Sequence, residues 1–271
     1  MIFFSGFVFD GREIYLTRVG GKKNCINLIQ FITQETMGDE EEPQCTVVYV
    51  DGEEEETTNW IKRAGKVKIT YVNGCTFEGT YDDEKVKQGK GVYIWMAKGE
   101  DEDAEMAEKA RYEGDYKNNM KHGVGKMTFP NKDVYEGEWF ENKMQGTGTY
   151  IYNSKASKDG QPDIYSGSWV DGKKEGDGRY EFGADQSMFV GTWAAGEMTT
   201  GKWELKGAGT YTGNFTLSRP VGEGKFEFVS GLEQGGSYDV VKTGEEEEAP
   251  EEGAAPLPPN VAWNGTNVVA F

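Results

Sequence analysis

One motif recurs along the chain, and it restricts the fold more than any other feature. It consists of an aromatic residue, any residue, glycine, any residue and a second aromatic, followed by Gly-x-Gly and a further aromatic residue. Tyr112–Phe129 is one copy and Tyr135–Tyr152 is the next. Each copy holds three glycines, and a glycine inside a helix costs up to about 1 kcal/mol. The repeat is therefore not helical.

Alternation with a period of two residues explains the motif as β-structure. Tyr112, Gly114 and Tyr116 fall on one side of an extended strand, and Glu113 and Asp115 fall on the other. Each copy is predicted to be a β-hairpin with one aromatic face, interrupted by glycines, and one charged face. We expect the rings to lie across the bare backbone of glycines on the neighbouring strand, which restores packing that glycine would otherwise lose.

The copies extend over residues 64–238 and predict an all-β fold, an elongated single-layer antiparallel sheet of consecutive hairpins. Insertions are expected at 98–110 and 153–163. In the copy that begins at Phe189, the expected Gly-x-Gly is Gly201-Lys202-Trp203, which predicts a tryptophan in a glycine position. The other copies begin at Phe77, Tyr112, Tyr135, Tyr165 and Tyr211, with half copies at Gly65–Tyr71 and Gly236–Tyr238.

Two further segments flank the repeats. Residues 1–63 are predicted to form a small N-terminal cap with strands at 11–19, 24–33 and 45–50, although 24–33 also suits a short helix. Residues 239–271 form an acidic, proline-rich tail with an apolar end that contains Trp263. That end is a docking candidate for this chain's own sheet or for a partner, and the alternative is that it frays.

Composition limits the classes of partner and chemistry. The net charge is −18, which opposes nucleic acid and anionic membrane surfaces. Aromatic residues make up 13% of the chain, too many for a disordered protein. The three cysteines, Cys25, Cys45 and Cys75, lack the spacing of a metal site and suit reduced thiols in the cytoplasm. No apolar stretch approaches the roughly 20 residues of a transmembrane helix.

Catalytic, cofactor-binding and metal-binding residues are not predicted. His122 is the single histidine, so metal sites and histidine-based catalysis have little material. Gly196–Lys202 fits the start of a phosphate-binding loop, but Trp203 stands where that loop needs Ser or Thr. We expect the protein not to be an enzyme and to need no cofactor.

The first-strand aromatics are the candidate site. Our interpretation is that this first-strand stripe holds a single-layer sheet together. The alternative is that part of it is exposed and binds another chain, because a sheet with one apolar face must cover that face. The stripe comprises Tyr112, Tyr116, Tyr135, Trp139, Tyr165, Trp169, Phe189, Trp193, Tyr211 and Phe215.

The motif YEGDYKNNMKHGVGKMTF resembles a MORN repeat, and YTGNFTLSRPVGEGKFEFVSGLEQGGSY (211–238) with the acidic run after it resembles the family of radial spoke head protein 1. This resemblance implies a non-enzymatic scaffold in the axoneme of motile cilia and flagella. The implied partners are other radial spoke head proteins and, through electrostatic contact of acidic loops, projections of the central pair. A homodimer through the sheet face is a further expectation. The alternative is a MORN-repeat adaptor at a membrane or cytoskeletal junction outside cilia.

Overall fold

The structure is a computed structural model that describes residues 4–9, 12–17, 45–51, 55–58, 61–99, 105–153, 160–241 and 260–270. The chain divides into two compact units, Met1–Pro43 and Gln44–Phe271. Each unit is described by itself.

The first unit contains one antiparallel hairpin. Strand β1 (Phe4–Phe9) pairs with β2 (Arg12–Thr17), with Phe4 opposite Thr17. Strand β2 lies within the strand predicted at 11–19, whereas β1 was not predicted. The strand predicted at 24–33 lies outside the described residues.

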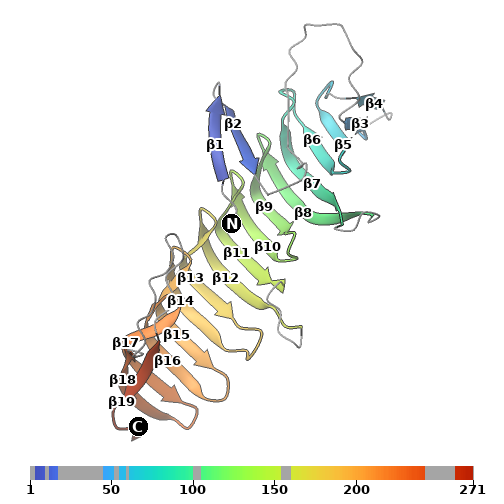
Figure 1. Ribbon diagram of the computed structural model, residues 1–271. Coiled ribbons are helices and arrows are strands. Elements are labelled where there is room, and N and C mark those ends of the chain that lie inside the picture. Colours follow the sequence, from blue (N-terminus) through green and yellow to red (C-terminus); the bar gives the residue numbers. More distant parts are fainter. Residues whose placement is uncertain are drawn as a thin grey trace. The chain divides into compact units, whose positions relative to one another are not determined.

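The second unit is a single open antiparallel sheet of 17 strands, β3 to β19, to which the short β20 is added beside β18. From β5 to β19, strands that follow one another in sequence lie side by side (Figure 1). At one end β3 pairs with both β4 and β5, and at the other end β18 pairs with both β19 and the short β20. The described residues form no helix, so none of them could cross a membrane as a helix. The predicted all-β, single-layer sheet of hairpins is confirmed.

The strands of this sheet run the length of the described repeats. The first eight are β3 (Cys45–Tyr49), β4 (Glu55–Thr58), β5 (Gly65–Tyr71), β6 (Thr76–Tyr81), β7 (Lys87–Lys98), β8 (Met106–Lys117), β9 (Met120–Thr128) and β10 (Val134–Phe140). The next five are β11 (Lys143–Tyr152), β12 (Asp163–Val170), β13 (Lys173–Glu181), β14 (Met188–Ala194) and β15 (Glu197–Leu205). The last are β16 (Gly209–Thr216), β17 (Arg219–Phe228), β18 (Leu232–Val240), β19 (Val261–Gly265) and β20 (Val269–Ala270).

The boundaries of the predicted segments change in three places. Because β3 pairs with both β4 and β5, the two strands β3 and β4 of the predicted cap belong to the repeat sheet. The boundary between the units falls at Pro43/Gln44 rather than at 63/64. The predicted insertion at 98–110 contributes Met106–Ala110 to β8, and Asp163 of the other insertion begins β12. The apolar end of the tail adds β19 and β20 to the sheet.

The two glycines of each Gly-x-Gly have different structural reasons. The first has a left-handed backbone, with φ of 59° at Gly123 and 64° at Gly146, in the strand segment where the register shifts by a β-bulge. Glycine adopts this conformation without steric cost. The second, such as Gly148, lies opposite glycines of both neighbouring strands. The first glycine therefore shapes the strand, and the second leaves room for a ring.

The register corrects the prediction for Trp203. Gly201 pairs with Gly191 and Gly213, so Gly201 is the second glycine of its copy, and Thr199 stands in the first glycine position. Trp203 therefore occupies the aromatic position that Tyr150 holds two residues after Gly148. The sequence alignment was wrong by two residues because this copy has lost its first glycine.

Candidate protein-interaction face

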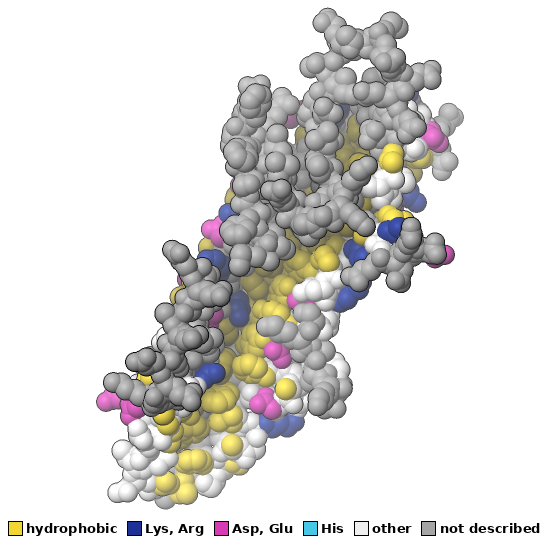
Figure 2. All heavy atoms as spheres, in the orientation of Figure 1, with side chains coloured by type: hydrophobic (Ala, Val, Ile, Leu, Met, Phe, Trp, Pro, Cys, Tyr) yellow, Lys and Arg dark blue, Asp and Glu magenta, His cyan; other side chains and the backbone are white. Residues whose placement is uncertain are grey.

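The first-strand stripe is buried along its whole length. Tyr112, Tyr135, Tyr165 and Tyr211 have no exposed surface, and the other six members are at most 7% exposed. Figure 2 shows the hydrophobic side chains as a band that runs along the sheet across successive strands. These ten residues therefore hold the layer together and present little surface to a partner.

Each stripe tyrosine that opens a copy of the repeat lies across a pair of glycines. A Cβ at Gly148 would lie 2.6 Å from Cε2 of Tyr135, and a Cβ at Gly137 would lie 2.6 Å from the hydroxyl of the same ring. The Tyr135 hydroxyl donates a hydrogen bond to the Glu138 carbonyl at 2.9 Å, and burial raises its pKa, so the hydroxyl keeps its proton. The predicted packing of rings on glycines is confirmed, and it repeats with Tyr112 over Gly125, Tyr165 over Gly178 and Tyr211 over Gly224.

The stripe tryptophans join one hairpin to the next. Trp139 packs edge to face against Tyr112 of the preceding copy at 5.4 Å and against Tyr135 of its own copy at 5.2 Å. Its indole nitrogen donates to the Gly125 carbonyl at 3.0 Å. Trp169 repeats this bond with Gly148. Among the described residues, the indole nitrogen of Trp193 has no hydrogen-bond partner.

A second row of rings, on or directly after the second strands, is partly exposed on the same face. These second-strand rings contact one another, for example Phe129 with Tyr150 at 5.6 Å and Tyr150 with Tyr152 at 4.4 Å between ring centroids. The signal in the sequence was an aromatic residue two or four positions after the second glycine. Sequence reasoning included an aromatic of this row in the motif but left the row out of the candidate site. The row comprises Trp95, Phe129, Tyr150, Tyr152, Phe182, Trp203, Phe226 and Phe228.

Two carboxylates lie beside this row, one buried and one partly exposed. Asp133 is 3% exposed and accepts hydrogen bonds from the Tyr150 hydroxyl at 3.1 Å and from the Asn131 amide at 2.8 Å. Asp163 accepts a hydrogen bond from the Tyr180 hydroxyl at 2.6 Å. These bonds fix the orientation of the tyrosines, because a buried polar group that loses its partner is costly.

Lysines begin several second strands and extend over the rings. The Lys87 ammonium lies 4.4 Å from the ring centroid of Phe77, and the Lys121 ammonium lies 4.7 Å from that of Trp139. Burial lowers the pKa of both lysines to about 8. Lys174 lies 4.3 Å from the ring of Trp193 in the same way, and Met144 and Met198 hold the equivalent place in two other copies. This row of lysines was not predicted, because in the sequence the lysines follow the turns and look like exposed charges.

The opposite face carries exposed ion pairs between neighbouring strands. Lys66 lies 3.1 Å from Glu78, and Lys90 lies 2.8 Å from Asp115. Exposed pairs of this kind stabilise by only about 0–1 kcal/mol each. These pairs make this face polar, in contrast to the apolar face that carries the rings.

Trp263, the predicted docking residue, lies on this chain's own sheet. Its ring centroid is 5.1 Å from that of Tyr238 and 5.3 Å from that of Phe226, and its indole nitrogen donates to Gln234 at 3.1 Å. A Cβ at Gly236 would lie 2.6 Å from the Trp263 ring. Trp263 thus continues the ring-on-glycine packing at the C-terminal end of the sheet.

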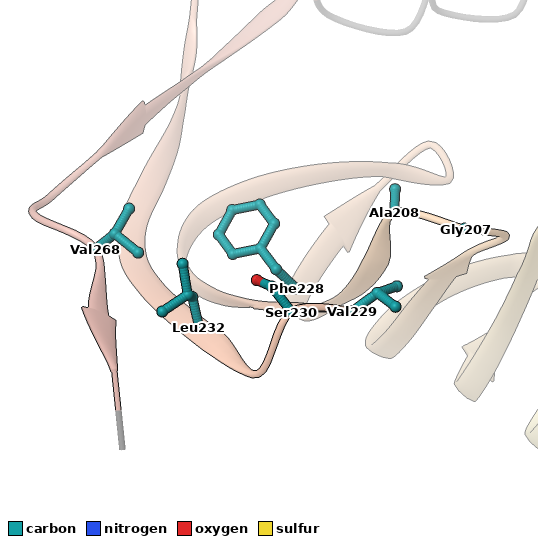
Figure 3. Close-up of a pocket in the computed structure, with 7 residues that line it drawn as sticks. All are labelled: Gly207, Ala208, Phe228, Val229, Ser230, Leu232 and Val268. Atoms are coloured by element: carbon teal, nitrogen blue, oxygen red, sulfur yellow. The ribbon is translucent and has the colours of Figure 1, made fainter.

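A shallow hollow of about 410 Å³ lies at the same end (Figure 3). Its lining includes Phe228, Val229, Leu232 and Val268, and none of its seven lining residues is charged. Among the described residues, no group of three or more His, Cys, Asp or Glu side chains could hold a metal ion. The hollow therefore offers apolar contact.

Comparison with known proteins identifies the repeats. The profile of the MORN repeat matches residues 84–96, 112–134, 135–157, 165–184 and 211–233, so the chain contains MORN repeats. The hairpin β14–β15 lies between two of these matches, yet Gly191 pairs with Gly201 there as in the other copies. The structural repeat is thus continuous where the sequence match is interrupted.

One curated relative with significant similarity is MORN repeat-containing protein 3 from Xenopus laevis. It is 33% identical to this chain over 106 residues, which cover 35% of this chain and 40% of the relative. The chain therefore spans less than half the length of that relative. MORN repeats suggest a non-enzymatic scaffold or adaptor built from repeats.

Proposed function

We propose that this MORN-repeat chain is a structural subunit of the motile cilium or flagellum axoneme, in the head of the radial spoke, where it assembles with other spoke-head proteins and faces the central pair. Its contribution is mechanical and electrostatic rather than catalytic. The localisation proposed with this function is the axoneme, within the cytoskeleton of the cell projection.

The observation that carries the scaffold function is that one row of rings is buried within the sheet and a second row is partly exposed. The first-strand stripe, with members such as Tyr135 at 0% exposure, fixes the sheet internally. The second-strand rings leave a partly exposed apolar row along successive hairpins. A row of this kind offers a partner an extended contact surface whose rings are held in place by the sheet. Aromatic side chains are also enriched at protein–protein interfaces.

Two features support the axonemal setting. The stretch 211–238, which forms β16, β17 and β18, carries the resemblance to the family of radial spoke head protein 1. The net charge of −18 supports repulsion from, or brief contact with, charged surfaces that move past the protein. Such contacts depend on ionic strength, because exposed charges are screened beyond about 10 Å at 0.1 M salt.

The second candidate is a MORN-repeat adaptor at a membrane or cytoskeletal junction outside cilia. The ion pairs on the opposite face, such as Lys66–Glu78, pair lysines of that face with carboxylates of the same chain, which weakens their attraction for anionic lipid. This observation favours a protein partner over a lipid surface in both candidate settings.

The test is crosslinking mass spectrometry on isolated axonemes, combined with stepwise salt extraction. We expect crosslinks between this chain and other spoke-head subunits, and release of this chain together with them. A chain absent from axonemes, or one extracted apart from the spokes, would overturn the axonemal proposal. Recovery with a junctional complex in a cell without cilia would support the adaptor instead.

A further inference from the structure

We propose that Lys87, Lys121 and the exposed side of Trp95 form a docking site for an extended acidic segment of a partner protein, whose carboxylates pair with the two lysine ammonium groups. This inference goes beyond the proposed scaffold function and does not depend on the cellular location. It names the chemistry of a partner segment and the place on the sheet that receives it.

The two ammonium groups lie close to several rings, and neither pairs with a carboxylate of the described residues. Lys87 is 8% exposed, and its ammonium lies 4.4 Å, 4.9 Å and 5.8 Å from the ring centroids of Phe77, Tyr93 and Tyr116. Within the part of the chain that the structure describes, this ammonium has no hydrogen bond or ion pair. Ring faces attract the cation but accept none of its three N–H donors as a carboxylate would.

Lys121 repeats the arrangement one hairpin along. Its ammonium lies over Trp139 at 4.7 Å, Tyr112 at 5.5 Å and Trp95 at 5.9 Å. It too has no carboxylate partner among the described residues. Trp95 is only partly buried, so an incoming segment that contacts its ring reaches the Lys121 ammonium as well.

The backbone holds each lysine in place through the next hairpin. The Lys87 N–H donates to the Asn119 side chain at 2.9 Å, and the Lys121 N–H donates to the Asn142 side chain at 2.9 Å. The Lys87 and Lys121 carbonyls also accept hydrogen bonds from the backbone N–H groups of the same two asparagines. The two cations are therefore positioned by the sheet before any partner arrives.

Charge complementarity identifies the occupant. Because neither lysine has a carboxylate partner among the described residues, this acidic protein has a local positive site on its apolar face. A carboxylate that enters this site accepts a charge-assisted hydrogen bond from a lysine ammonium. Lys87 is only 8% exposed, and Lys121 is partly buried. A slender protein segment can reach them with its side chains, whereas a flat anionic membrane cannot approach so closely.

The spacing of the strands sets the spacing of the carboxylates. Lys87 begins β7 and Lys121 lies on β9, two strands apart, which corresponds to about 10 Å at the usual strand separation. In a polyproline II segment, residues three apart share one face about 9 Å apart. A helix is about 10–12 Å wide, which is too broad for two of its carboxylates to pass between the rings and reach both ammonium groups. The occupant is therefore an extended segment with acidic residues three positions apart.

Fluorescence anisotropy tests the site on the full chain at low ionic strength. The probe is a labelled peptide of repeated Glu-Pro-Pro units, and the control probe has Gln in place of Glu. We expect saturable binding of the Glu peptide and none of the Gln peptide. The double variant Lys87→Met/Lys121→Met should bind the Glu peptide at least about tenfold more weakly, a loss of about 1.4 kcal/mol. Met144 and Met198 show that methionine fits the equivalent place, so this variant should keep the fold.

The matched control is Lys90→Met, which removes a lysine from the opposite face, where it pairs with Asp115. It should leave binding unchanged. The proposal is overturned if the Glu peptide does not bind, or if it binds the double variant as tightly as the unmodified chain. Lysine-dependent binding to phosphatidylserine vesicles, or tighter binding of a helical peptide with the same carboxylate spacing, would also overturn it. Absence from axonemes would refute the proposed location and leave this binding intact.

Discussion

Tyr135 lies across Gly148 so closely that a Cβ at Gly148 would sit 2.6 Å from Cε2 of the ring, nearer than real Cβ atoms come to a neighbour. The Tyr135 ring is fully buried and its hydroxyl is bonded to Glu138, so it cannot move aside freely. The glycine and the tyrosine are therefore one packing unit that links two strands.

The first prediction concerns this unit. Gly148→Ala should lower the free energy of unfolding by about 1–3 kcal/mol, because the added methyl overpacks a filled site. Urea denaturation followed by tryptophan fluorescence measures the change. The control is Gly235→Ala, where a Cβ would meet only the Thr266 hydroxyl at 3.7 Å. Equal losses for the two variants would contradict the packing described here.

The second prediction separates the hydrogen bond of a stripe tryptophan from its volume. Trp139→Phe loses ring volume and the bond to the Gly125 carbonyl, whereas Trp193→Phe loses ring volume alone. Trp139→Phe should therefore cost about 1 kcal/mol more in unfolding free energy. The same denaturation assay compares the two variants. A larger loss for Trp193→Phe would show that the bond does not stabilise the sheet.

The third prediction tests the register of the copy that contains Trp203. If Trp203 stood in a glycine position, Trp203→Gly would relieve crowding. Because Trp203 stands in an aromatic position, we expect Trp203→Gly to lower the free energy of unfolding by roughly 2–3 kcal/mol. This value is toward the lower end of losses for large aromatic residues, because the ring is partly exposed. Trp203→Tyr should cost under about 1.5 kcal/mol. Differential scanning calorimetry of both variants decides between the two registers.

The fourth prediction follows from the lowered pKa of Lys87. Burial lowers this pKa from 10.5 to about 8, so the unfolded chain binds more protons between these values. The free energy of unfolding should therefore rise with pH from about 8, by up to roughly 1.4 kcal/mol per pH unit for this lysine. Tyr71, whose pKa burial raises to about 12, acts in the opposite sense above pH 10 and sets the upper limit of the window.

The measurement compares the pH dependence of unfolding for the unmodified chain and Lys87→Met between pH 8 and pH 10. Groups common to both chains cancel in the difference. The unfolding free energy of Lys87→Met should exceed that of the unmodified chain most at pH 8. This difference should shrink as the pH rises, because the buried lysine is then uncharged in the folded chain. A difference that stays constant across this window would contradict a lowered pKa.

The fifth prediction concerns the C-terminal end of the sheet. Trp263→Ala removes the ring that contacts Tyr238 and Phe226, so β19 should lose its attachment to β18. We expect faster amide hydrogen exchange in β18 and β19 and unchanged exchange in β10 and β11. Val268→Ala, at a side chain that is 49% exposed, is the control and should leave the exchange of β19 unchanged. Protection of β19 that survives Trp263→Ala would contradict the role of this ring.

The sequence predicted correctly which residues of a single strand share a face. Alternation placed Tyr112, Gly114 and Tyr116 on one face, and the structure confirms both the face and the hairpins. It failed where two strands must be compared. The sequence motif takes Gly201 as the first glycine of Gly-x-Gly and so places Trp203 in the second glycine position. The hydrogen-bond register instead aligns Gly201 with Gly191. The partly exposed rings were left out of the candidate site because exposure depends on which neighbours cover a side chain.

The amino-acid sequence by itself determined the strand period, the hairpins and the ring-on-glycine packing, because all three follow from the residues within a single copy of the repeat. Only the tertiary structure decided that the tyrosine stripe is buried, that Lys87 and Lys121 lie over rings, and that Trp263 extends the sheet. The reason is physical. Burial and the loss of charge partners arise from contacts between strands, and a repeat sequence leaves the register of those contacts open until backbone hydrogen bonds fix it.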